Sequence, residues 1–148
     1  MKQLDSIKAH ILKERVESTW DITDHYWYPL NECKRSDVLA FDHNIIEEIE
    51  EKITDVRRIL LKLNYNSVYE MNEDRLVWLI DTDLLVPAMG KNNDERFWFS
   101  EDMSWIIYVS HEGSITFGGE ELLTQIKSKS DNWQSKLFAP EYGQAVDE

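Results

Sequence analysis

The chain has 148 residues, of which 42% are hydrophobic and 30% are charged, and its formal net charge is −13. A domain of this length can bury roughly two-thirds of the surface that the unfolded chain exposes, so we expect a single domain over residues 1–148. The negative charge disfavours nucleic acid as a ligand, because binding to phosphates depends on Lys and Arg. It favours basic proteins or cations as partners, and acidity that serves only solubility is the alternative.

Cysteine content and hydropathy set the expected compartment. Cys33 is the only cysteine in the sequence, which favours a reducing environment and excludes a thiolate-rich zinc site. Residues 1–19 mix charged and apolar side chains and lack the apolar core of a signal peptide. No apolar run approaches the roughly 20 residues that span a bilayer. We therefore expect a cytoplasmic protein without a membrane segment.

Two helices are predicted in the first half of the chain. The first ends near Trp20, and its apolar side chains recur at the spacing of a surface helix: Leu4, Ile7, Ile11, Leu12, Val16 and Trp20. The second runs from about residue 44 to residue 63, and we expect it to bury one face: Ile49, Ile53, Val56 and Leu60. Between them, residues 21–40 contain Pro29 and many turn-forming side chains. This predicts mostly loop, with a short edge strand at 25–30 as the alternative.

A period of two, or a continuous apolar run, replaces the helical period after Asn64. Strands are predicted at residues 67–71, 75–81, 96–99, 103–110 and 114–117, the last three as a meander. The strand at 75–81 is apolar on both faces, so we expect it to be central. Gly118 and Gly119 let the chain leave the sheet for a helix at 120–129, and a further packed turn follows near Trp133.

This order of elements indicates an α+β domain. We predict an antiparallel sheet in the middle and C-terminal half of the chain. Two N-terminal helices and one C-terminal helix cover this sheet, and we expect them on one side of it. Residues 140–148 have little to bury and are expected to form a loose tail.

Acidic and aromatic side chains concentrate in the same part of the chain. Residues 65–121 contain twelve Asp and Glu against three Lys and Arg, so this stretch carries nine of the thirteen net negative charges. It also contains nine of the seventeen aromatic residues. A sheet that presents carboxylates and aromatic rings suits binding to a basic protein, because charge steers the encounter and buried rings supply binding energy.

We predict one protein-binding patch on the meander. Trp98 faces away from the two phenylalanines that flank it, and Tyr108 lies on the polar face of the next strand, so both rings are expected to be partly exposed. Glu101 and Asp102 occupy the turn between these strands, and Glu112 occupies the turn at the other end. The predicted patch is therefore Trp98, Glu101, Asp102, Tyr108 and Glu112, with a basic protein as its partner.

Two clusters offer the alternative of a small metal-dependent or hydrolytic enzyme. Asp21, Asp24 and His25 supply oxygen and nitrogen ligands, while His111 and Glu112 share a turn with two serines. Neither cluster has the spacing of a zinc hydrolase or an EF-hand, and caps or turns are the simpler interpretation. We therefore expect no cofactor and no metal.

Residues 97–123 carry a family resemblance. The segments FWFSEDMS and WIIYVSHEGSITFGGEELL resemble the C-terminal half of small bacterial proteins, some of which are similar to immunity proteins that neutralise a partner toxin. The resemblance implies a non-enzymatic cytoplasmic inhibitor that docks an acidic surface against a basic face of a toxin. A third hypothesis is an oligomeric intracellular scaffold in which the aromatic patch joins two copies of the chain.

Overall fold

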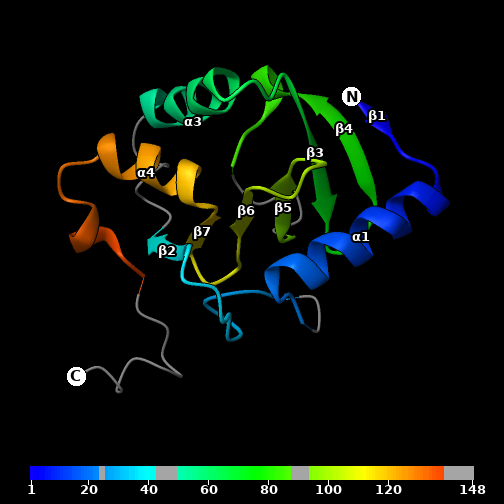
Figure 1. Ribbon diagram of the computed structural model, residues 1–148, viewed down its shortest axis with the longest axis horizontal. Helices are drawn as coiled ribbons and strands as arrows, with labels where there is room; N and C mark the ends of the chain where they lie inside the picture. The colour runs from blue at the N-terminus through cyan, green and yellow to red at the C-terminus, as the bar shows by residue number, and fades with distance from the viewer. Residues whose placement is uncertain (24–25, 43–49, 88–93, 139–148) are drawn as a thin grey trace.

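The computed structural model describes residues 1–23, 26–42, 50–87 and 94–138 (Figure 1). In chain order its elements are β1 (Lys2–Gln3), α1 (Ser6–Trp20), β2 (Val38–Asp42), α3 (Glu50–Lys62), β3 (Ser67–Asn72), β4 (Val77–Asp81), the 3₁₀ turn η1 (Thr82–Leu84), β5 (Arg96–Phe99), β6 (Ile106–Val109), β7 (Ser114–Gly118), α4 (Glu120–Ser128) and the 3₁₀ turn η2 (Trp133–Lys136). Helices and one antiparallel sheet confirm the predicted α+β class. The predicted tail at 140–148 lies outside the described residues.

The strands form one seven-stranded sheet in the order β1-β4-β3-β5-β6-β7-β2, and every neighbouring pair is antiparallel. The predicted meander is confirmed as β5, β6 and β7. The strand β4 was expected to be central but lies next to the two-residue edge strand β1, and β5 takes the central place. The strand β2 begins within the segment 21–40 that was expected to be loop, and it pairs with β7 along five residues.

Helices pack against both faces of the sheet, so the expectation of helices on one side was wrong. Strand residues alternate between two apolar clusters: Trp98, Ile107 and Phe117 pack with residues of α3 and α4, while Phe97 and Tyr108 pack with residues of α1. Figure 1 shows α3 and α4 together and α1 separately on the other side of the sheet. Both faces of β5 and β6 are apolar enough to need such cover.

The helix α1 begins and ends at well-defined caps. The Asp5 side chain accepts a hydrogen bond from the Lys8 backbone N–H at 2.8 Å, and Asp21 ends the helix in the left-handed conformation with φ of 61°. Four side chains are buried: Ala9, Leu12, Val16 and Trp20. Ile7 and Ile11 belong to the predicted stripe but are 74% and 52% exposed. The buried face is therefore narrower than the sequence pattern indicated.

The helix α3 confirms part of the predicted second helix. Val56 and Leu60 are fully buried, whereas Ile53 is only partly buried at the margin of the same cluster. Ile49 and the predicted start near residue 44 lie outside the described residues. None of the helices in the described residues has the length and apolar composition needed to cross a membrane.

The segment between α1 and β2 packs onto the sheet instead of extending into solvent. Trp27 is fully buried, and its indole N–H donates to the Trp20 carbonyl at 2.5 Å. The Thr116 hydroxyl of β7 donates to the Tyr28 carbonyl at 2.6 Å. The alternative prediction for this segment was an edge strand at 25–30. Within residues 26–30 there is a single β-bridge, which joins Tyr26 to Thr23, and turns follow it. The segment thus closes the face of the sheet that α1 leaves open.

Candidate functional site

The predicted aromatic members of the patch are both buried. Trp98 is 1% exposed and its indole N–H donates to Glu70 Oε1 at 2.8 Å, while Tyr108 is fully buried and stacks on Phe97 with ring centroids 4.5 Å apart. Strand pairing places Phe97 opposite Tyr108, so Trp98 and Tyr108 lie on opposite faces of the sheet. The helices α3 and α4 cover one ring, and α1 with Trp27 covers the other. Their expected exposure was therefore wrong.

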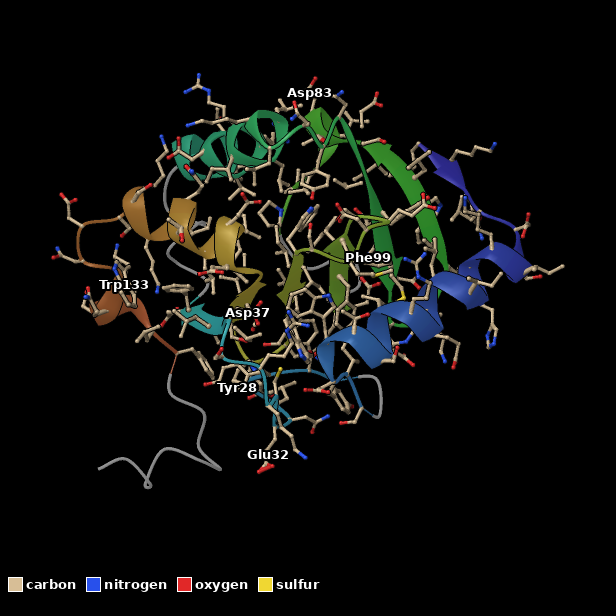
Figure 2. All side chains as sticks on the ribbon, viewed as in Figure 1. Tyr28, Glu32, Asp37, Asp83, Phe99 and Trp133 are labelled. Atoms are coloured by element: carbon tan, nitrogen blue, oxygen red, sulfur yellow. The ribbon has the colours of Figure 1, made fainter. Side chains whose placement is uncertain are left out.

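The three acidic members of the patch are exposed but do not lie together. Glu101 and Asp102 lie in the turn between β5 and β6, whereas Glu112 lies in the turn between β6 and β7 at the opposite end of the strands. Asp83 of η1 also projects at the Glu101 end, where Figure 2 labels it at the edge of the molecule. Glu101, Asp102 and Asp83 thus share one end of the sheet, and Glu112 does not lie with them.

A hollow of about 390 Å³ lies beside Glu101 and Asp102. We call it the polar hollow. Its lining includes the side chains of Tyr65, Tyr69, Ser100, Glu101 and Asp102, and among the described residues that line it there is no Lys or Arg. Burial raises the pKa of both tyrosines, so their hydroxyls stay protonated and can donate hydrogen bonds. Its lining therefore holds two carboxylates and no basic side chain, and Lys8 of α1 lies next to it, beside Tyr69.

Asp102 is held rigidly at the edge of the polar hollow. Its Oδ1 accepts hydrogen bonds from the Ser100 hydroxyl at 2.5 Å, the Ser104 backbone N–H at 3.0 Å and the Ser104 hydroxyl at 2.8 Å. Its Oδ2 accepts from the Tyr65 hydroxyl at 2.8 Å. Burial alone would raise the pKa of Asp102, but these four donors outweigh burial and hold the pKa at about 2. The carboxylate is therefore ionised at any physiological pH.

The depressed pKa of Asp102 predicts a pH-dependent contribution to stability. A carboxyl with a lowered pKa stabilises the fold above its unfolded pKa of about 3.9, and this contribution is lost as the pH falls toward its folded pKa of about 2. Because the side chain is exposed, we expect Asp102→Asn to lower the free energy of unfolding by only about 1 kcal/mol at pH 6. Urea denaturation at pH 6, 4 and 2.5 should show most of that difference disappearing by pH 2.5. An equal difference at all three values would contradict the prediction.

A second hollow, of about 300 Å³, adjoins the first. We call it the isoleucine hollow, because the exposed Ile7 and Ile11 of α1 line it. The rest of its lining combines apolar and charged side chains: Asp5, Lys8, Leu12, Arg15 and Glu101. Glu101 lines both hollows and so separates them. Its carbonyl accepts a hydrogen bond from Arg15 Nη2 at 2.8 Å, and its Oε1 accepts one from the Tyr69 hydroxyl at 3.1 Å. These contacts fix the β5–β6 turn between α1 and β3.

Another polar cluster lies at the opposite end of the sheet, around His111. His111 Nδ1 is 2.6 Å from Glu95 Oε2, and Nε2 is 3.1 Å from Glu73 Oε1. The His111 backbone N–H and the Tyr108 hydroxyl also donate to Glu95, which is 1% exposed. Burial raises the pKa of Tyr108 well above its usual range, and the charge of Glu95 raises it further. Sequence reasoning missed both glutamates, because Glu73 follows β3 and Glu95 precedes β5, far from His111 in the sequence.

The proposed enzymatic arrangement of His111 with Glu112 and a serine does not occur in the described contacts. The carboxylates that contact the imidazole belong to Glu73 and Glu95. The two flanking serine hydroxyls, of Ser110 and Ser114, lie 2.6 Å from each other inside the turn. A nucleophilic triad needs the imidazole between the serine and the acid, which this geometry does not provide.

The other proposed cluster is described only in part, because Asp24 and His25 lie outside the described residues. Asp21 Oδ2 accepts a hydrogen bond from the Lys34 backbone N–H at 3.2 Å, which ties the end of α1 to the segment before β2. Within residues 1–23, 26–42, 50–87 and 94–138, no group of three His, Cys, Asp or Glu side chains is arranged to hold a metal ion.

No protein-family model, curated protein or solved structure matches this chain. Its function is therefore inferred from the geometry of its own residues.

Proposed function

We propose that this chain is a non-enzymatic binding module that docks a basic protein at the end of the sheet where the polar hollow and the isoleucine hollow meet. The observation that supports this most directly is the rigid, ionised Asp102 in a hollow whose described lining has no basic side chain. A lysine or arginine side chain of a partner would complement that charge. Two carboxylates and two tyrosine hydroxyls line the space that it would enter.

Long-range charge favours the same partner. The chain carries a net charge of −13, and the acids Glu101, Asp102, Asp81 and Asp83 are exposed at this end of the sheet. Such a concentration of one sign raises the association rate of an oppositely charged protein, and added salt weakens the effect. Charge therefore determines the association rate and the selectivity of binding more than the dissociation rate.

The exposed isoleucines account for the lifetime of the complex. Ile7 and Ile11 are 74% and 52% exposed, and they lie one helical turn apart on α1. Fully burying such a side chain contributes about 1.5–3 kcal/mol, so covering both would slow dissociation substantially. A partner that fits both hollows presents a cationic side chain next to an apolar one.

The proposed role agrees with the resemblance of residues 97–123 to immunity proteins. On this proposal the partner is a basic bacterial toxin, and the chain neutralises it in the cytoplasm by covering its basic face. The proposed surface differs from the predicted patch in two respects, of which the first is that Glu112 lies at the other end of the sheet. Tyr65, Tyr69, Ile7 and Ile11 replace the buried rings of Trp98 and Tyr108 beside Glu101 and Asp102.

The test begins with capture of partners on the immobilised full chain and their identification by mass spectrometry. The captured protein is then purified, and its binding is measured by surface plasmon resonance at two salt concentrations. We expect a basic protein whose association slows about tenfold or more with the double variant Glu101→Lys and Asp102→Lys. The double variant Ile7→Ser and Ile11→Ser should mainly raise its dissociation rate.

Two variants at the other end of the sheet serve as controls. Glu112→Lys makes the same kind of charge change, and Leu76→Ser replaces another exposed apolar side chain, which is 42% exposed. Both should leave the rates close to wild type. Equal effects of the control and test variants would refute the proposed surface. Analytical ultracentrifugation could also refute the proposal, by showing a dimer of this chain that dissociates in the isoleucine variants. A second copy of the chain would then occupy the proposed surface.

A further inference from the structure

The imidazole of His111 faces a carboxylate with each of its two ring nitrogens. Nδ1 lies 2.6 Å from Glu95 Oε2, and Nε2 lies 3.1 Å from Glu73 Oε1. A carboxylate only accepts hydrogen bonds, and a neutral imidazole has a single N–H. Both contacts can be hydrogen bonds only when both ring nitrogens carry protons. The geometry therefore fits the imidazolium form of His111.

We propose that the doubly protonated His111 is a pH-sensitive latch that holds the β6–β7 turn against the β3–β4 turn. Histidine exchanges its ring proton between about pH 5 and pH 8. When the ring loses one proton, one nitrogen presents a lone pair to a carboxylate, and attraction becomes repulsion. The latch is therefore closed while the ring holds both protons and open once it has lost one.

In the surroundings of the latch, Glu95 depends on His111 for compensation of its negative charge. Glu95 is 1% exposed, and the cation that contacts it in the described part of the chain is the His111 imidazolium. From β6, the Tyr108 hydroxyl donates to it, and the raised pKa of Tyr108 keeps that phenol neutral. From the β3–β4 turn, Glu73 adds a second negative charge and accepts a hydrogen bond from the Glu95 backbone N–H at 2.7 Å.

The other charged groups near this end do not replace the imidazolium. Arg96 pairs with Glu70 and Asp94 at 2.5 Å and 3.2 Å, and Arg75 pairs with Glu17 of α1. Tyr26 approaches Tyr108 from the segment after α1 and brings no positive charge. Loss of the ring proton would thus leave two carboxylates close together, one of them buried, and no cation among the described residues pairs with either. Such an arrangement costs free energy that opening of the exposed turn would relieve.

Nuclear magnetic resonance of the wild-type chain tests the protonation state directly. Nitrogen chemical shifts of the His111 ring at pH 5.5 should show both nitrogens protonated, and at pH 8.5 only one. The His111 backbone N–H donates to Glu95 Oε2 at 3.0 Å, so its hydrogen exchange reports on the turn. After correction for the intrinsic pH dependence of exchange, we expect its protection to fall about tenfold between these pH values.

The variant His111→Gln should show low protection of this turn at both pH values. His10→Gln, which changes an exposed histidine of α1, is the control and should keep the wild-type pH dependence. A neutral His111 ring at pH 5.5, or protection that does not change with pH in the wild type, would overturn the proposal. The ring measurement decides the question even if His111→Gln does not fold.

Discussion

Trp98→Ala should lower the free energy of unfolding by about 3–5 kcal/mol, as expected when a large aromatic side chain is removed from a core. Trp98 is 1% exposed and belongs to the cluster that joins the sheet to α3 and α4. The substitution would leave a cavity at the centre of β5, the middle strand of the sheet. It would also remove the buried hydrogen bond that the indole N–H donates to Glu70 Oε1 at 2.8 Å. The measurement is urea denaturation followed by circular dichroism.

Trp98→Phe separates the two causes of this loss. Phenylalanine keeps an aromatic ring in the core but supplies no N–H, so the remaining effect reports mainly on the hydrogen bond to Glu70. We expect a smaller loss, of about 1–3 kcal/mol, because Glu70 is 9% exposed and still pairs with Arg96 at 2.5 Å. A loss below about 1 kcal/mol for Trp98→Ala would instead place the ring at the surface, as the sequence pattern had indicated.

Local periodicity predicts the elements of this fold well. The helices α1 and α4 and the β5–β6–β7 meander follow from spacings that lie within one element or one hairpin. Strand β2 was missed, because its sequence Val38–Asp42 lies next to a stretch rich in turn-forming residues. Its pairing with β7 joins residues far apart in the chain, and no local pattern specifies such a contact.

Exposure of the aromatic rings could not be predicted from alternation along the strands. Tyr108 shares one side of the predicted strand at 103–110 with Ser104 and Ser110, and that composition indicated a solvent-facing side. The side is covered because α1 and Trp27 fold over it, and Glu95 accepts the Tyr108 hydrogen bond there. Both partners are distant in sequence, so the burial is a tertiary effect.

The acidic end of the sheet was accessible to sequence reasoning in part. Glu101 and Asp102 were expected in an exposed turn, and they occupy one. The donors that fix Asp102 include the near neighbours Ser100 and Ser104, so a Ser-x-Asp-x-Ser pattern could have indicated a rigid carboxylate. Tyr65 joins this group through long-range contacts, which the turn sequence does not contain.

Gly119→Ala should be among the most damaging substitutions of a small residue in the chain. Gly119 joins β7 to α4 with φ of 109°, and an added Cβ would lie 2.4 Å from the Ser104 carbonyl oxygen and 3.0 Å from the Trp105 Cα. Backbone strain contributes about 1–3 kcal/mol and overpacking against fixed backbone about 1–3 kcal/mol more. We expect a total loss of about 3–5 kcal/mol in the free energy of unfolding, measured by chemical denaturation.

Gly113→Ala is the matched control for this prediction. Gly113 also has a positive φ, of 83°, but an added Cβ would meet no atom within 4 Å. The control therefore carries the backbone strain without the clash, and we expect it to cost only about 1–2 kcal/mol. The difference between the two variants measures how closely the β7–α4 junction packs against the β5–β6 turn that carries Asp102. Equal losses would show that this contact yields without cost, and the expected clash with the Ser104 carbonyl would then be wrong.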